Sequence, residues 1–264
     1  MIYLWEKDIP LWNGEIGQEP PALEERIVEG AKACIIVIPG GGYEWIAYDH
    51  EGDAIANALN ENGISAYILR YRIRPYHHPA MQYDVNRAVR VARSLAGKYG
   101  YDADKIGVLG FSAGGHLAAT AVTHFDYGKD DGDLIDRISC RPDLGVLCYA
   151  VIQIFDKYTH EGSSVNLLGA TYEKVDRALA DSMSAEKAVR DDTPPCFIWH
   201  TFEDNCVPCE NSILFAKALA DKKVPFELHV FPEGPHGLGL APEFPHSAQW
   251  FPLLVKFIGN RLKI

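Results

Sequence analysis

The stretch Lys105-Ile-Gly-Val-Leu-Gly-Phe-Ser-Ala-Gly-Gly-His-Leu-Ala-Ala119 decides the fold of this 264-residue chain. Its first part is an apolar run that predicts a buried strand, and its last part is alanine-rich and predicts a helix. Between them lies Gly110-Phe-Ser-Ala-Gly114, a Gly-x-Ser-x-Gly motif. A strand, a sharp turn and a helix are the setting in which this motif presents a nucleophile, so we predict that role for Ser112.

The two glycines of the motif allow the turn. The serine must occupy a tight, strained turn if its hydroxyl is to project above the sheet. Side chains at Gly110 and Gly114 would then collide with the neighbouring strand or helix. The backbone amide of Ala113 would point at the negative charge that develops on a substrate oxygen, at a helix N-terminus that favours such charge. The competing interpretation is a glycine-rich turn in which Ser112 only caps the helix.

A second glycine-rich segment, Ile38-Pro-Gly-Gly-Gly-Tyr43, directly follows the apolar run at 34–38. Successive glycines let backbone N–H groups turn toward a substrate oxygen without obstruction by side chains. We therefore expect the amides of Gly41 and Gly42 to complete the oxyanion hole, and the sequence leaves open which of them dominates. Many esterases have His-Gly-Gly-Gly at this place, whereas Pro39 stands here where the histidine would be. The alternative is a flexible connection before a helix.

Strand and helix patterns alternate along the whole chain. Short β-rich runs predict strands at 34–38, 64–69, 105–110, 145–150, 196–200 and 226–231, and the continuous apolar run at 34–38 is typical of a strand buried on both faces. Apolar residues at helical spacing predict helices at 51–61, 81–98, 211–222 and 246–262. This alternation predicts an α/β fold, a mostly parallel central sheet with helices on both faces. We expect a single domain over 1–264, in which 158–190 interrupts the alternation as a short excursion over the active-site edge.

The general base and its orienting acid should follow the serine, in the order serine, acid, histidine. His236 lies in a Gly/Pro-rich segment after the last predicted strand, and we predict it as the base, with His246 as the alternative. Asp204 follows the strand at 196–200 and is the predicted acid, with adjacent Glu203 as the alternative. A carboxylate at this place holds the imidazole in the required tautomer. We interpret His116, inside the helix after the serine, as a packing or capping residue.

Six cysteines are scattered along the chain. Cys34, Cys148 and Cys196 lie in apolar runs, where a free thiol behaves as a small hydrophobic side chain. The segment Cys206-Val-Pro-Cys209 has redox-motif spacing, but no thioredoxin-like opening precedes it and no second pair completes a zinc site. We therefore expect reduced thiols, no metal and no organic cofactor. Reduced thiols, together with the absence of a visible signal peptide, predict a cytoplasmic location.

The formal net charge of −11 limits the partners of this chain. An acidic surface repels phosphate backbones and anionic membranes, so we expect neither nucleic acid nor a membrane as partner. No apolar run is long enough to span a bilayer. The expected partner is a small-molecule or oligosaccharide ester, and the sequence leaves a homo-oligomer open.

Several motifs in sequence resemble the acetyl esterase and acetylxylan esterase-like branch of the α/β-hydrolases, and the resemblance covers most of the chain. They are Pro39-Gly-Gly-Gly-Tyr43, Glu51-Gly52, Leu69-Arg-Tyr-Arg72, Gly110-Phe-Ser-Ala-Gly-Gly-His116, Asn166-Leu-Leu-Gly169, Asp204 with Val207-Pro208, and Gly234-Pro-His-Gly237. The resemblance implies a triad of Ser112, Asp204 and His236, with Gly41, Gly42 and Ala113 around the oxyanion. It also implies a small or absent cap and short acyl substrates, often acetyl groups on xylose-based saccharides.

We therefore expect a serine carboxylic-ester hydrolase that works through an acyl-enzyme and removes acetyl groups, from xylo-oligosaccharides or related sugars. A feruloyl-type or general carboxylesterase is the alternative, because it uses the same residues in a differently shaped pocket. A serine peptidase of this fold is a less expected alternative, because such enzymes commonly carry a large additional domain for which 264 residues leave no room. A non-catalytic hydrolase-fold binder usually lacks one triad member, whereas this chain has a complete candidate set.

Overall fold

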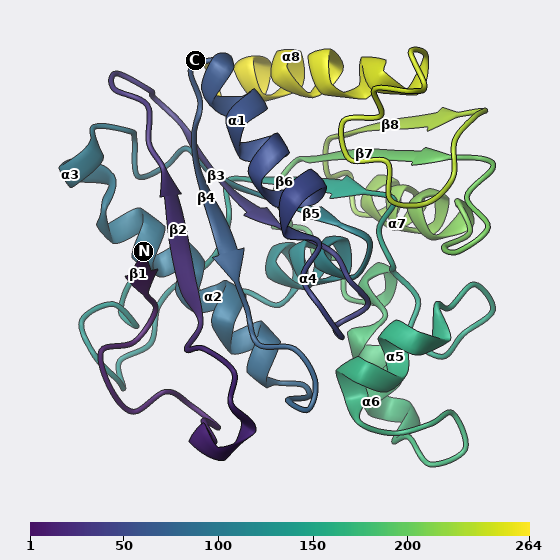
Figure 1. Cartoon of the computed structure of the whole chain (residues 1–264), viewed down its shortest axis with the longest axis horizontal. Coiled ribbons are helices and arrows are strands. Elements are labelled where there is room, and N and C mark those ends of the chain that lie inside the picture. The colour runs from purple at the N-terminus through teal and green to yellow at the C-terminus, as the bar shows by residue number, and fades with distance from the viewer.

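Eight strands form one sheet through the centre of the protein (Figure 1). The computed structural model describes residues 1–264. In chain order the strands are β1 (Ile2–Tyr3), β2 (Ala22–Arg26), β3 (Cys34–Ile38), β4 (Ser65–Arg70), β5 (Ile106–Phe111), β6 (Leu144–Cys148), β7 (Cys196–Thr201) and β8 (Phe226–Phe231). In the sheet they lie in the order β1-β2-β4-β3-β5-β6-β7-β8, and β3 to β8 run parallel to one another. The predicted α/β class with a mostly parallel sheet is confirmed.

The six predicted strands correspond to β3 to β8, and their ends agree to within two residues. Their apolar runs follow from burial on both faces, since every residue of β3, β5, β6 and β7 is buried. The antiparallel strands β1 and β2 at one edge are missing from the prediction. The sequence of β2 is Ala-Leu-Glu-Glu-Arg, and its charged half is only partly buried, so it shows no apolar run.

Helices cover both faces of this sheet (Figure 1). One face carries α2 (Ala80–Ser94), α4 (Ser112–Thr123) and α7 (Glu210–Asp221), whose apolar side chains belong to the larger buried core. The other face carries α1 (Ala54–Glu61) and α8 (Trp250–Leu262), which build a second core. The sheet is therefore buried between two helical layers, as its apolar strands require.

The four predicted helices are present with local differences. The helix expected at 81–98 is interrupted at Leu95, so that α2 is followed by the short helix α3 (Ala96–Tyr99). A π-helical turn, Asp49–Asp53, precedes α1, and a 3-10 turn, Ser247–Gln249, precedes α8. A 3-10 turn is common at a helix end and a π-helical turn is rare, but periodicity alone distinguishes neither of them from α-helix.

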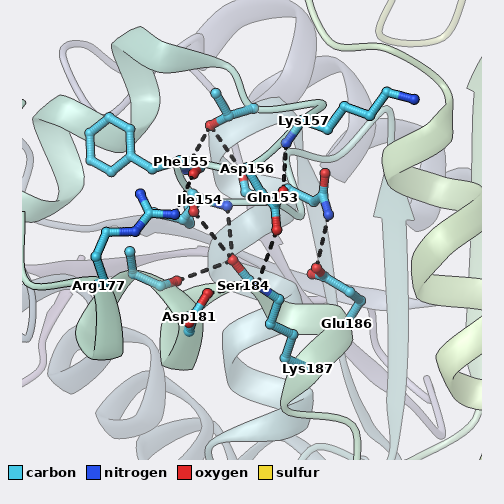
Figure 2. A network of polar contacts seen from close by, with 12 residues as sticks. Gln153, Ile154, Phe155, Asp156, Lys157, Arg177, Asp181, Ser184, Glu186 and Lys187 are labelled. Atoms are coloured by element: carbon cyan, nitrogen blue, oxygen red, sulfur yellow. Dashed lines mark hydrogen bonds and ion pairs between the residues drawn. The ribbon is translucent and has the colours of Figure 1, made fainter. Parts of the chain in front are cut away.

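The segment after β6 contains two short helices, α5 (Glu161–Leu168) and α6 (Arg177–Met183). Figure 1 shows them together at one end of the molecule, away from α8. A polar network fastens the segment (Figure 2): the Ile154 N–H donates to Ser184 Oγ at 3.0 Å, and Gln153 Nε2 donates to Glu186 Oε1 at 3.1 Å. These contacts hold the chain that leaves β6 against the chain that follows α6. No helix in the protein combines the length and the apolar composition needed to cross a bilayer.

Candidate active site

Ser112 occupies the turn between β5, which ends at Phe111, and α4. Its φ of 52° is in the left-handed region, which is strained for a residue with a side chain. A Cβ at Gly110 would lie 2.1 Å from the carbonyl oxygen of Gly114, and a Cβ at Gly114 would lie 2.2 Å from that of Ile38. The collisions expected from the sequence are therefore present, and only glycine fits at both positions.

The structure brings Ser112, His236 and Asp204 together at the carboxyl ends of the parallel strands. His236 Nε2 lies 2.8 Å from Ser112 Oγ, and His236 Nδ1 lies 2.7 Å from Asp204 Oδ2. Ser112 and Asp204 are buried, and the His236 side chain is 20% exposed. Both contacts are within hydrogen-bond reach, and the imidazole stands between hydroxyl and carboxylate. This arrangement can move a proton from the serine hydroxyl to the imidazole while the carboxylate fixes the imidazole tautomer.

Asp204 is held as a carboxylate by several donors. The backbone N–H groups of Cys206 and Val207 each donate to Oδ1 at 2.9 Å, and His200 Nε2 lies 3.3 Å from Oδ2. Burial alone would raise the pKa of Asp204, but the hydrogen bonds from His200, His236 and Val207 outweigh it and hold this pKa well below its usual range. The side chain is therefore ionised over the whole neutral range.

The alternative candidates have other partners. Glu203 accepts a hydrogen bond from the backbone N–H of Gly234 at 3.0 Å. His246 packs edge-on against Phe231, with ring centroids 5.4 Å apart, just before α8 begins. His116 is fully buried, with Nδ1 2.7 Å from the Tyr43 hydroxyl and Nε2 2.8 Å from the carbonyl oxygen of Met183. None of these three side chains contacts the Ser112 hydroxyl.

The predicted oxyanion donors lie around Ser112. The backbone N–H groups of Gly41, Gly42 and Ala113 donate to no other backbone group. Gly41 has φ 120° and Gly42 has φ 65°, so both adopt conformations that favour glycine. Gly41, Gly42 and Ser112 line one cavity of about 410 Å³. Gly41 and Gly42 thus bring amides without a backbone acceptor to the cavity that Ser112 also lines, and a developing oxyanion requires such donors.

Four side chains at the site were not predicted in these roles. His200 is buried against Asp204, and Asn166 of α5 donates from Nδ2 to the carbonyl oxygen of Gly42 at 2.8 Å. Glu51 accepts a hydrogen bond from the backbone N–H of Gly40, and Tyr149 packs edge-on against His236. Glu51 and Asn166 belong to motifs quoted above, which is a signal that could have drawn attention to them. His200 and Tyr149 lie in ordinary apolar runs and gave no signal.

Most of the residues that line the cavity are polar or glycine. The lining residues are Gly41, Gly42, Glu44, Trp45, Ala47, His50, Glu51, Ser112, His160, Gly162, Asn166, Cys206, His236 and Gly237. Trp45, the largest hydrophobic side chain among these residues, is 56% exposed. Neither Cys206 nor Cys209 forms a disulfide, and no group of three or more His, Cys, Asp or Glu side chains gathers as a metal site would require.

Comparison with known proteins identifies a family and a solved relative. A family model described as BD-FAE matches residues 25–219, which is more than half of the chain. A crystal structure described as an acetyl ester-xyloside bifunctional hydrolase from Caldicellulosiruptor lactoaceticus is 46% identical to this chain. The two superpose with a TM-score of 0.94, over 98% of this chain and 95% of that chain. The fold predicted from the sequence is therefore shared with a solved α/β-hydrolase.

Two curated relatives are longer than this chain. Endo-1,4-beta-xylanase B of Butyrivibrio fibrisolvens is 45% identical over 213 residues, which are 79% of this chain and 33% of that protein. Acetylxylan esterase of Xylanibacter ruminicola is 31% identical over 232 residues, which are 87% of this chain and 45% of that protein. The chain thus spans less than half the length of either relative.

Proposed function

This chain belongs to the BD-FAE family of α/β-hydrolases, and we propose that it is a serine esterase that removes short acyl groups from sugars. The acyl group is acetyl, and the sugar is a xylo-oligosaccharide or a related saccharide. The observation that carries the proposal is the pair of hydrogen bonds from Ser112 to His236 and from His236 to Asp204, beside free amide donors. The names of the acetylxylan esterase and acetyl ester-xyloside hydrolase relatives support the acetyl group and the sugar.

The proposed mechanism uses only groups of the chain, substrate and water. His236 Nε2 takes the proton of Ser112 Oγ as this oxygen bonds to the ester carbonyl carbon. The resulting oxyanion accepts hydrogen bonds from the amides of Gly41, Gly42 and Ala113. When the carbon–oxygen bond to the sugar breaks, the imidazolium returns the proton to the sugar oxygen. Water then attacks the acyl-enzyme with His236 as the base, and acetate and the free serine are released.

The lining of the cavity supports a small polar ester. His50, His160 and Asn166 offer polar groups around Ser112 that can hydrogen-bond to the hydroxyl groups of a sugar. The exposed ring of Trp45 next to Gly41 offers a flat apolar surface on which the carbon face of a sugar ring can pack. This combination favours a saccharide ester over a lipid ester.

A substrate panel tests the proposal. Initial rates are measured on p-nitrophenyl acetate, butyrate and octanoate and on methyl ferulate, and acetate release is measured on acetylated xylo-oligosaccharides. We expect the acetyl ester to give the highest kcat/KM and the oligosaccharides to be deacetylated. A preference for octanoate would overturn the short-acyl proposal, and a preference for methyl ferulate over every acetyl ester would replace it with the feruloyl-type alternative.

Domain organisation, location and assembly are parts of the same proposal. We propose that residues 1–264 act as one catalytic domain with no metal or organic cofactor, since the mechanism needs neither. All six cysteines are free, which fits a reducing compartment such as the cytoplasm. Both a monomer and a homo-oligomer are compatible with this proposal. Size-exclusion chromatography with light scattering measures the assembly directly.

A further inference from the structure

Glu51 is a buried carboxylate that lies below the oxyanion loop, defined here as residues 39–43. The residue is only 2% exposed and comes from the π-helical turn before α1. Its Oε2 accepts a hydrogen bond from the backbone N–H of Gly40 at 2.8 Å. A Cβ at Gly40 would lie 2.9 Å from the Cβ of Ser112, so the backbone of Gly40 packs directly against the proposed nucleophile. The carboxylate therefore fixes the residue immediately before Gly41 and Gly42.

The second carboxylate oxygen of Glu51 reaches the other half of the site. The Tyr149 hydroxyl donates to Glu51 Oε1 at 2.8 Å and accepts from the backbone N–H of Gly239 at 2.9 Å. The Tyr149 ring also packs edge-on against the His236 imidazole, with centroids 5.0 Å apart. Gly239 lies three residues after His236, so this chain of contacts ends on the loop that carries the proposed base.

We propose that Glu51 is a positioning residue that holds the oxyanion loop and the His236 loop in fixed positions relative to Ser112. The inference rests on the proposed function, because it assigns its role relative to Ser112 and His236. Glu51 touches no reacting atom in the mechanism above. It acts through the Gly40 amide on one side and through the Tyr149 hydroxyl on the other.

The chemistry of both contacts requires a carboxylate. The Gly40 N–H and the Tyr149 O–H both donate, and the Tyr149 oxygen already accepts from Gly239. A carboxylate offers an acceptor to each donor, whereas a glutamine would face one of them with its own N–H group. One buried donor would then lose its partner and shift to find another. Burial raises the pKa of Glu51, and the hydrogen bonds from Tyr149 and Gly40 act against it.

The test compares Glu51→Gln with the wild-type protein on p-nitrophenyl acetate. Active sites are counted with a fluorophosphonate, so that kcat refers to folded, reactive protein. We expect kcat to fall about ten- to a hundredfold with KM changed less than about twofold, because a displaced oxyanion donor weakens mainly the transition state. The affinity for a trifluoromethyl ketone, whose adduct with serine carries an oxyanion, should fall by a similar factor.

Asp143→Asn is the matched control. Asp143 also joins a backbone N–H, that of Ile106 at 3.0 Å, to a second side chain, Arg93 at 2.9 Å. It precedes β6 and thus lies at the amino ends of the parallel strands, whereas Ser112 lies at their carboxyl ends. We expect this variant to unfold at lower urea concentration and to keep kcat and ketone affinity within about twofold of the wild type. An equal loss of kcat in Asp143→Asn and Glu51→Gln would overturn the positioning role.

Tyr149→Phe is a second test of the positioning role, because it keeps the hydrogen bond between Glu51 and Gly40 and removes the link to Gly239. We expect a smaller loss of kcat than in Glu51→Gln, and a double variant little worse than Glu51→Gln alone. If Glu51→Gln does not fold, unchanged kcat and ketone affinity in Tyr149→Phe overturn the inference. Unchanged kcat in a folded Glu51→Gln overturns it while the proposed function stands. A wild-type protein without turnover on any acetate ester overturns both.

Discussion

At Ser112 the backbone adopts a conformation that costs a residue with a side chain on the order of 1 kcal/mol or more. The surroundings impose it, because Gly110, Gly114 and Gly115 leave no room for the turn to relax: a Cβ at any of them would meet a neighbour within 3 Å. The strain aims the hydroxyl away from the helix and toward His236. This geometry is the physical content of the Gly-x-Ser-x-Gly motif.

The carboxylate of Asp204 gives the first prediction. In Asp204→Asn the side-chain amide would face His236 Nδ1 with a donor and favour the wrong imidazole tautomer. We expect kcat on p-nitrophenyl acetate to fall about a thousandfold or more while KM changes little. Glu203→Gln is the control, since Glu203 contacts Gly234 and not His236. A loss of similar size in the control, or no loss in Asp204→Asn, would contradict the assignment of the acid.

The role of a single residue can be predicted from the sequence when the residue belongs to a recognisable motif. Ser112, Asp204 and His236 follow from motif, loop position and chain order. Glu51 and Tyr149 do not, because the bond between them joins distant segments of the chain. His200 does not either, because it lies within an apolar strand run, although Asp204 is only four residues away. No periodicity or spacing records which tyrosine of an apolar run meets a carboxylate 98 residues away.

Helix α4 contains the buried side chain of His116, which makes the stability of the fold depend on pH. Burial lowers the pKa of His116 to about 4, from an ordinary value of 6.5. Between these pH values the unfolded chain binds a proton at this position and the folded protein does not, so stability falls as pH falls. We expect the wild type to lose about 2 kcal/mol more unfolding free energy than His116→Gln between pH 7 and pH 4.5. Urea unfolding at both pH values measures it, and equal losses in the two proteins would refute the prediction.

Helix α5 is tied to the oxyanion loop through Asn166, whose amide donates to the carbonyl oxygen of Gly42. We expect Asn166→Ala to lower kcat on p-nitrophenyl acetate about three- to tenfold, because Gly42 gains freedom to turn its N–H away from the oxyanion. Asn62→Ala is a matched control, since Asn62 makes the same kind of bond to Ala58 on the exposed end of α1. A drop in kcat shared by both variants would speak against a specific effect of Asn166.

The elements themselves were largely readable from the sequence. Apolar runs predicted β3 to β7 because these strands are almost fully buried, and the β-rich run at 226–231 predicted β8, which is mostly half-buried. The strands β1 and β2 were not readable, because β1 has only two residues and the second half of β2 is charged and only partly buried. The break between α2 and α3 was not readable either, since Leu95 continues the apolar pattern through it.

In the whole molecule, the buried pair of Arg72 and Asp84 joins the end of β4 to α2. Arg72 Nη2 lies 2.7 Å from Asp84 Oδ1, both side chains are fully buried, and Arg72 also donates to the carbonyl oxygens of Pro10 and Ala80. Removing one partner leaves an unpaired buried charge. We expect Arg72→Met to lower the free energy of unfolding by about 3–5 kcal/mol, measured by urea titration.

Arg70→Met is the control for that loss. Arg70 pairs with Glu24 at the surface, where its side chain is 45% exposed, so we expect a change of at most about 1 kcal/mol. Equal losses of unfolding free energy in the two variants would contradict a larger contribution of the buried pair to stability. The comparison separates burial of the pair from the simple loss of an arginine.

The overall architecture was predictable because strand–helix alternation with apolar strands has few compatible topologies. The path of the chain between β6 and β7 was not. There the course of the backbone depends on contacts such as those of Ser184 and Gln153, which no local sequence pattern predicts (Figure 2). The same segment carries His160 and Asn166 to the cavity, so the substrate pocket was the least predictable part of the molecule.

The turnover of Ser112→Ala on p-nitrophenyl acetate tests the central claim most directly. The serine hydroxyl is the only group in the proposed mechanism that bonds to the acyl carbon during the first half-reaction. We expect kcat to fall at least about ten-thousandfold while the variant keeps its folded structure by circular dichroism, and we expect it to take up no fluorophosphonate. A folded Ser112→Ala protein with turnover within tenfold of the wild type would contradict the account.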